Sequence, residues 1–297
     1  MRILNFGSCN IDYVYSLNHI VNAGETLSSE KLEIFPGGKG LNQSIAAARA
    51  GLAVCHAGCV GKDGEMLLGI LNESGVDTSY IKVVDGKNGH AIIQVSPEGE
   101  NSIFLYAGSN EMVSKEYIDS VFDNFTEDDI VLLQNEISNI DYVIEKAYEK
   151  NMRIALNPSP INENIFKLDF NMISYIILNE IEAKAITGCD DTKKSLEVFK
   201  EKFPNLKVML TLGKKGCVYM DLQTIVSREA FSVKAVDTTA AGDTFTGYFL
   251  AGISKGAEIE ETLELASCAS AIAVSRAGAA PSIPVIDEVQ EMLQNMK

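Results

Sequence analysis

Short apolar runs alternate with helical stretches along nearly the whole chain, and this rhythm restricts the fold more than any other feature. Each run is brief and ends in a polar residue or a glycine, which is typical of strands buried on both faces of a parallel sheet. We predict such strands at residues 2–6, 130–133, 153–156, 175–178 and 207–211. Helical stretches lie between them at residues 139–150, 180–187, 191–203 and 258–275. The alternation indicates βαβ units and an α/β fold with a wound, mostly parallel sheet flanked by helices.

Two segments interrupt this rhythm. Residues 13–35 show no clear helical period, and residues 90–106 have the pattern of a hairpin around the turn-rich segment Ser96–Asn101. We interpret both as β additions that form one small lid from about residues 11–35 and 88–106. No proline-rich or Gly/Ser-rich linker divides the chain, so we predict a single domain over residues 1–297 that carries this lid.

The composition excludes several classes of protein. With 46% hydrophobic and 22% charged residues, the chain has the balance of a globular protein rather than a disordered one. The net charge of −16 argues against sequence-independent nucleic-acid binding, which depends on Lys and Arg neutralising phosphates. No apolar run is long enough for a membrane span, and the apolar N-terminus breaks at Gly7, so we expect neither a membrane partner nor a secretory signal.

The cysteines and histidines do not form a metal-binding pattern. The six cysteines and three histidines lack the paired spacing of a zinc site, and His56 beside Cys55 lies in a run that has the pattern of a strand. Free thiols without an export signal indicate a reducing compartment, so we predict a cytoplasmic protein.

The familiar nucleotide fingerprints are absent, but a first polar cluster follows the first predicted strand. The chain has no GxxxxGK[ST], and no GxGxxG follows residues 2–6. In the segment Gly7–Asp12 the side chains of Asn10 and Asp12 point to the same side of an extended chain. An amide beside a carboxylate can bind a pair of sugar hydroxyls. The alternative is a polar strand end with an Asx turn.

A second cluster is the glycine-rich segment Pro36–Gly40, which opens an alanine-rich helix. Its glycines allow the backbone to approach a ligand closely. Lys39 lies at the helix start, where a lysine opposes the helix dipole unless an anion or hydroxyl ligand is present. Asn42 lies one turn later, so both side chains can face one pocket. A solvated turn would have the same pattern.

The third and strongest cluster is Val236–Phe245, followed by an apolar helix that we expect to continue through Ile253. Its small residues stand where the helix begins, so their N–H groups and the helix dipole would form an anion-binding cradle. Asp243 beside that cradle has the position of a general base for phosphoryl transfer. The alternative is that Asp243 only caps the helix.

Together the three clusters resemble the signatures of the ribokinase family, the PfkB-type sugar kinases, and the resemblance covers essentially the whole chain. Gly-Ser-x-Asn-x-Asp and Gly-Gly-Lys-Gly-x-Asn-Gln look like the first signature, and Asp237–Phe245 looks like the second. Segments Asn157–Pro160, Leu178–Glu182 and Thr211–Gly213 also look like family landmarks. The resemblance implies a nine-stranded or similar sheet with a β lid, and ATP-dependent phosphorylation of a sugar hydroxymethyl group.

The resemblance also assigns residues. The positions that match sugar contacts are Asn10, Asp12, Gly38, Lys39, Asn42 and Glu136, with Asp243 as the base and the amides of Ala240, Ala241 and Gly242 as the anion hole. Those that match the nucleotide side are Asn179, Thr211, Gly213, Gly242 and Ser267, and Glu182 matches a residue linked indirectly to Mg²⁺. Those that match a K⁺ loop are Asp237, Thr239, Ala273, Arg276, Gly278 and Ser282. The expected cofactors are therefore ATP, Mg²⁺ and the activator K⁺.

The sequence departs from the family at Ala240, where many members carry glycine, and Cys9 and Leu41 adjoin the sugar contacts. The sugar set includes no Arg or additional Lys for a substrate phosphate, which favours D-ribose, converted to ribose 5-phosphate, over hexose phosphates. The alternatives are a nucleoside kinase, another PfkB-type sugar kinase or a catalytically silent sugar-binding regulator. We also expect a homodimer through the lid, because the hairpin at 90–106 has edges and apolar faces that need a partner.

Overall fold

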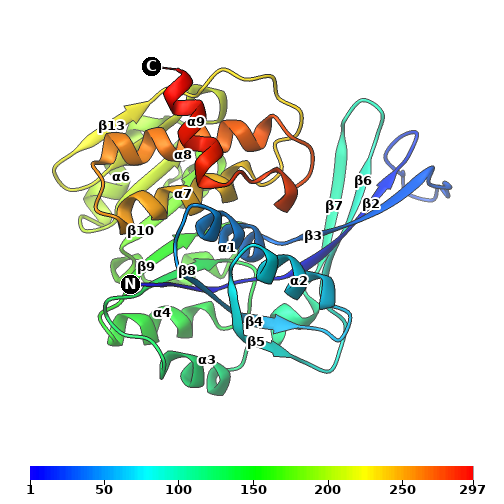
Figure 1. Ribbon diagram of the computed structural model, residues 1–297, viewed down its shortest axis with the longest axis horizontal. Helices are drawn as coiled ribbons and strands as arrows, with labels where there is room; N and C mark the ends of the chain where they lie inside the picture. Colours follow the sequence, from blue (N-terminus) through cyan, green and yellow to red (C-terminus); the bar gives the residue numbers. More distant parts are fainter. Residues whose placement is uncertain (297) are drawn as a thin grey trace.

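The main sheet has nine strands in the order β13-β12-β11-β10-β9-β8-β1-β4-β5 (Figure 1). The structure is a computed structural model and describes residues 1–296. The strands are β1 (Ile3–Phe6), β4 (Val54–Val60), β5 (Asp77–Val83), β8 (Ile130–Gln134), β9 (Arg153–Asn157), β10 (Tyr175–Asn179), β11 (Lys207–Thr211), β12 (Cys217–Met220) and β13 (Ile225–Arg228). In this sheet order, all neighbouring strands between β11 and β5 run parallel to one another. The pairs β11–β12 and β12–β13 are antiparallel.

Helices cover both faces of this sheet. They are α1 (Lys39–Arg49), α2 (Glu65–Glu73), α3 (Lys115–Phe122), α4 (Ile140–Glu149), α5 (Glu180–Thr187), α6 (Thr192–Lys202), α7 (Ala241–Ser254), α8 (Ile259–Val274) and α9 (Ile286–Asn295). Alternate strand residues enter different cores: Leu132 packs with side chains of α1, α2, α7, α8 and α9, and Leu133 with those of α3 to α6. This confirms the predicted wound α/β fold, with the predicted strands and helices close to their observed bounds.

The lid is a separate sheet with the strand order β3-β2-β6-β7. Its strands are β2 (Asn10–Ser16), β3 (Lys31–Gly37), β6 (Gly89–Val95) and β7 (Asn101–Tyr106). The outer pairs are antiparallel, and the central strands β2 and β6 are parallel. The lid projects away from the main body (Figure 1), and β2 follows β1 after only a short connection, so the lid joins the main sheet beside the carboxyl end of β1.

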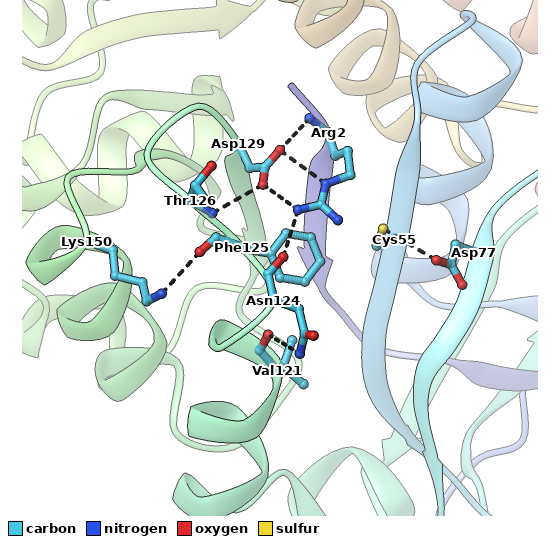
Figure 2. A network of polar contacts seen from close by, with 9 residues as sticks. All are labelled: Arg2, Cys55, Asp77, Val121, Asn124, Phe125, Thr126, Asp129 and Lys150. Atoms are coloured by element: carbon cyan, nitrogen blue, oxygen red, sulfur yellow. Dashed lines mark hydrogen bonds and ion pairs between the residues drawn. The ribbon is translucent and has the colours of Figure 1, made fainter.

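A polar network lies at the amino ends of the parallel strands (Figure 2). Arg2 precedes β1, and its backbone and guanidinium nitrogens donate to Asp129, which precedes β8, at 2.7 and 2.8 Å. The guanidinium also donates to the carbonyl oxygen of Asn124. Because these residues lie at the amino ends of the strands, the network is structural.

Within residues 1–296, every helix is too short or too polar to cross a membrane.

Candidate active site

A cavity of about 410 Å³ lies at the carboxyl ends of the parallel strands, between the main sheet and the lid. In open α/β sheets this edge is the usual place for a ligand. The cavity brings together many of the site residues predicted from the sequence: Asn10, Asp12, Gly38, Lys39, Asn42, Glu136, Asn179, Glu182, Thr211, Thr239, Ala240, Gly242 and Asp243. They come from both ends of the chain and from the strand ends between them.

Glycine residues permit the segment after β1 and the start of α1 to approach each other closely beside this cavity. A Cβ on Gly40 would lie 2.5 Å from the Cα of Gly7 and 2.3 Å from the backbone nitrogen of Ser8. Gly38 has a φ of 95°, which favours glycine, and it lies immediately before α1. The start of α1 is thereby held directly against the end of β1, and Lys39 and Asn42 lie beside Asn10.

Glu136, which follows β8, connects these loops. Its carboxylate accepts a hydrogen bond from the backbone nitrogen of Lys39 at 3.0 Å and another from the hydroxyl of Ser8. Burial raises the pKa of Glu136, and the nearby charge of Lys39 offsets only part of this effect. The pKa of Asp12 is raised to about 7, first by burial and then by the negative charge of Glu136.

The ammonium group of Lys39 is stabilised by its carboxylate neighbours. Burial lowers the pKa of Lys39, but the negative charges of Asp243, Glu136 and Glu182 outweigh it, so the pKa lies above its ordinary value. A lysine in the first turn of a helix opposes the dipole. These carboxylates explain how the protein tolerates Lys39 at that position.

Asp243 lies in the first turn of α7, but its side chain is directed away from that helix. Its carboxylate accepts from Asn42 Nδ2 at 3.1 Å and from Gln43 Nε2 at 2.9 Å, both on α1. The N-cap of α7 is Ala240, which has a left-handed φ of 58°. The hydrogen bonds of the Asp243 side chain therefore go to α1, and they do not cap α7. The first N–H groups of α7 lack partners within the helix, although the amide of Ala241 donates to the carbonyl oxygen of Thr238 at 3.3 Å, and Ala240 and Gly242 line the cavity.

The side chains of Asn179 and Glu182 reach the cavity and also bond to each other. Asn179 Oδ1 accepts from the backbone nitrogen of Glu182 at 3.0 Å, and Glu182 Oε2 accepts from that of Asn179 at 2.9 Å, which forms a capping box at α5. Two other residues predicted on the nucleotide side, Gly213 and Ser267, lie outside this cavity, as does Ala241. Gly213 begins a short turn after β11, and Ser267 lies buried on α8 with its hydroxyl 3.7 Å from Cys217 Sγ.

The residues predicted to form a K⁺ loop belong to two adjacent segments. The backbone nitrogens of Val236 and Asp237 donate to the carbonyl oxygen of Val274, and the Asp237 carboxylate accepts from the backbone nitrogen of Gly278 at 3.0 Å. The same carboxylate accepts from the Thr239 hydroxyl at 2.6 Å. Of the remaining members of the predicted set, Arg276 pairs with Glu288, and Ala273 and Ser282 are buried.

Several cavity residues were not predicted from the sequence. On the lid, Ala91, Ile93, Ile103 and Leu105 face inward, and Asn157 and Ser159 follow β9. The period of two in the predicted hairpin would have identified the lid residues. Gln43, which contacts Asp243, was part of the glycine-rich motif but received no role.

Comparisons with known proteins show what this chain is similar to. Residues 2–286 match the model of the pfkB family carbohydrate kinase. A ribokinase from Haemophilus influenzae is 34% identical over 97% of both chains. The structure of a Cryptococcus neoformans ribokinase in complex with ADP has a TM-score of 0.86 and 32% identity, covering 98% of this chain and 99% of that one. The structure of an Arabidopsis thaliana ribokinase complexed with ribose and ATP has a TM-score of 0.87 and 26% identity, covering 99% of this chain and 98% of that one.

Proposed function

Because this chain belongs to the pfkB family of carbohydrate kinases and is an ATP-dependent sugar kinase, we propose that it phosphorylates D-ribose to ribose 5-phosphate. One observation carries the proposal. Asp243 shares one cavity with Asn10, Asp12 and Lys39, whose polar side chains are able to bind sugar hydroxyls. The similar proteins that are named ribokinases support ribose as the sugar.

In the proposed reaction Asp243 is the general base. The sugar hydroxymethyl oxygen bonds to the γ-phosphorus of ATP while the bond from that phosphorus to the β,γ-bridging oxygen breaks, and ADP leaves. The hydroxyl proton passes to the Asp243 carboxylate. The first amides of α7, from Ala240 to Gly242, stabilise the charge of the phosphoryl group in transfer. Asp243→Asn should therefore lower kcat by about 10²- to 10⁴-fold while sugar binding persists.

The donor set suits Mg²⁺, which usually binds through one or two carboxylates, several waters and substrate phosphates. Glu182 is the carboxylate available on the nucleotide side, and it already accepts hydrogen bonds from Asn179. We therefore expect Glu182 to act through waters. When bound, Mg²⁺ would neutralise charge on the transferring phosphates.

The lid supplies the cover that excludes water. Ile93, Ile103 and Leu105 present apolar side chains to the cavity from above. A kinase that admits water beside ATP hydrolyses it instead of phosphorylating the sugar. We expect the lid to close over ribose bound at Asn10 and Asp12.

The test is ADP release from purified protein with ATP, Mg²⁺ and K⁺ across ribose, 2-deoxyribose, fructose, nucleosides and phosphorylated hexoses. Turnover on ribose with little on the other sugars supports the proposal. Turnover on another sugar alone would retain the kinase mechanism and refute ribose as the substrate. No turnover on any of them would contradict the catalytic roles.

A nucleoside kinase is the second candidate, and the shape of the protein gives one reason for it. A further cavity of about 800 Å³ adjoins the first, and Asn10, Leu105 and Glu136 line both. This space could accept a base attached to the anomeric carbon. Comparable turnover of ribose and a nucleoside in the same panel would favour this candidate.

We further propose that K⁺ activates the enzyme through the loops around Asp237 and Gly278, and that two copies associate through the lid. The cytoplasmic location stays a prediction from the cysteine content. The K⁺ loop and the dimer are each tested by a prediction below.

A further inference from the structure

A chain of buried side-chain amides runs behind Asp243, from α7 through α1 to β8 and β1. Gln43 Nε2 donates to Asp243 Oδ1 at 2.9 Å, and Gln134 Nε2 donates to Gln43 Oε1 at 2.8 Å and to Asn5 Oδ1 at 3.1 Å. Asn5, Gln43 and Gln134 are fully buried, and the cavity is lined by other residues. None of these three side chains can therefore contact a ligand in the cavity, and Gln43 is the one that contacts Asp243.

A backbone carbonyl sets the direction of this chain. Asn5 Nδ2 donates to the carbonyl oxygen of Gly40 at 2.8 Å, and since a carbonyl only accepts, the nitrogen of Asn5 must face it. The oxygen of Asn5 then faces Gln134 and requires an N–H from it. The same nitrogen of Gln134 meets the oxygen of Gln43. The nitrogen of Gln43 is consequently the atom that faces Asp243.

Close packing of α1 against α7 brings Gln43 within reach of Asp243. A Cβ on Gly247 would lie 2.5 Å from the Ala46 Cβ and from the backbone nitrogen of Ala47. Gly247 lies one turn after Asp243, and Ala47 lies one turn after Gln43, so each pair shares a helix face. The glycine allows the two helices to approach until the Gln43 amide meets the carboxylate.

We infer that Gln43, oriented by Gln134, is a positioning residue that holds the Asp243 carboxylate toward the sugar hydroxyl. The inference rests on the proposed role of Asp243 as base. Asn42 holds the other carboxylate oxygen at 3.1 Å but also lines the cavity. Gln43 holds Asp243 without reaching any ligand there, so its contribution is one of geometry. A displacement of a reacting group by about 1 Å can lower a rate about 100-fold.

The first test is Gln43→Met, which keeps the approximate shape of the side chain and removes the donor. We expect kcat to fall about 10- to 100-fold, as for a lost hydrogen bond to a charged group, while KM for ribose and ATP changes less than about threefold. The matched control is Thr262→Val, because Thr262 is buried on α8, outside the predicted site segments, and its hydroxyl has no hydrogen-bond partner within residues 1–296. Its kcat should equal that of the wild type.

A double-mutant cycle separates positioning from stability. Gln134→Met removes the donor that orients Gln43, and we expect an intermediate loss of kcat. Gln43→Met/Gln134→Met should be no slower than Gln43→Met alone, because Gln134 acts through Gln43. The single variant Gln43→Met leaves the Gln134 amide facing an apolar side chain, and the double variant removes that amide. That removal also leaves the buried Asn5 oxygen without its donor, so the melting temperature of the double variant should fall below that of Gln43→Met while kcat does not fall further.

Asp243→Asn in the same series distinguishes a failure of the positioning role of Gln43 from a failure of the proposed function. An inactive Asp243→Asn together with a Gln43→Met kcat within twofold of the wild type overturns the positioning role and leaves the proposed function intact. Additive losses in the double variant, or a kcat that follows the melting temperature, also overturn it. An Asp243→Asn protein that keeps more than a tenth of the activity refutes the base itself and removes the premise of the inference.

Discussion

At the scale of single residues, the candidate site concentrates ionisable groups where water is scarce. Asp12, Glu136 and Asp243 all line the cavity that contains Lys39. Burial and the charge of Glu136 raise the pKa of Asp12 to about 7. A carboxylate must be ionised to accept hydrogen bonds from two hydroxyls with both oxygens. Sugar affinity should consequently weaken as the pH falls below about 7.

Asp12 also makes stability depend on pH, in a direction that can be worked out. Its pKa in the folded protein lies above the ordinary value of 3.8, so the folded state binds a proton more tightly than the unfolded chain. The resulting stabilisation is complete below about pH 3.8 and is lost as the pH rises through about 7. Asp12→Asn removes this loss. Between pH 5 and pH 8, the free energy of unfolding of the variant should therefore rise relative to that of the wild type by on the order of 1 to 4 kcal/mol.

Denaturant unfolding at pH 5 and pH 8 measures this difference. The control is Asp85→Asn, because the Asp85 side chain is 91% exposed and pairs only with Lys62. The free energy of unfolding of the control should depend on pH in the same way as that of the wild type. If Asp12→Asn does the same, then Asp12 is solvated and its pKa is not raised.

At the scale of elements, the contact between the end of β1 and the start of α1 sets the geometry of the proposed sugar site. Gly40→Ala would direct a Cβ at backbone atoms of Gly7 and Ser8, which cannot move aside. We expect a loss of about 1 to 3 kcal/mol in the free energy of unfolding and a raised KM for ribose, since α1 carries Lys39 and Asn42.

Gly69→Ala is the matched control for that substitution. Gly69 lies within α2, and a Cβ there meets no atom within 4 Å. Alanine should stabilise this helix by up to about 1 kcal/mol without a change in KM. Thermal unfolding and ribose kinetics of both variants provide the measurement. A Gly40→Ala protein as stable as the wild type would contradict the tight contact.

The junction of the 236–239 and 273–278 segments gives a second prediction at this scale. We expect faster turnover in K⁺ than in Na⁺, because the backbone carbonyls of these loops would hold the larger cation. Asp237→Ala removes the hydrogen bonds to Thr239 and Gly278 that tie the loops together, and it should raise the K⁺ concentration needed for half-maximal activity. The measurement is ADP release in titrations of KCl and NaCl after thorough desalting. Equal rates in both salts would refute the cation loop.

At the scale of the whole molecule, the sequence predicted the fold better than it predicted the site. The run at 175–178 identified β10 because a strand buried on both faces must be apolar throughout. The alternation of side chains also predicted that Asn10 and Asp12 share a side, and both line the cavity. Strand bounds in residues 13–35 could not be located, since half-exposed lid strands have weak patterns.

Contacts between distant segments were beyond sequence reasoning. Gln43 and Asp243 are 200 residues apart, and their hydrogen bond depends on how α1 packs against α7. No local pattern encodes that packing. Similarly, the lid order β3-β2-β6-β7 pairs two hairpins through parallel central strands, which turn residues alone do not indicate.

The lid is apolar on both faces, and this leads to the prediction about assembly. Ile103 and Leu105 face the cavity. Because successive strand residues alternate, Phe104 faces the other way, and it is 57% exposed. On β3, Ile34 lies in the same cross-strand row as Phe104 and is 50% exposed. An apolar outer face on a projecting sheet is typical of a surface that binds a protein partner.

We therefore expect a dimer in solution, which Phe104→Glu should dissociate by burying a charge in the interface. Leu222→Glu is the control, because Leu222 is 55% exposed in the turn between β12 and β13, away from the lid. Light scattering across a wide concentration range should give a dimer mass for the wild type and the control and a monomer mass for Phe104→Glu. A wild-type monomer mass that does not change with concentration would contradict the dimer. If the dimer also steadies the lid, Phe104→Glu should raise KM for ribose, because the inner face that covers the sugar belongs to the same strand.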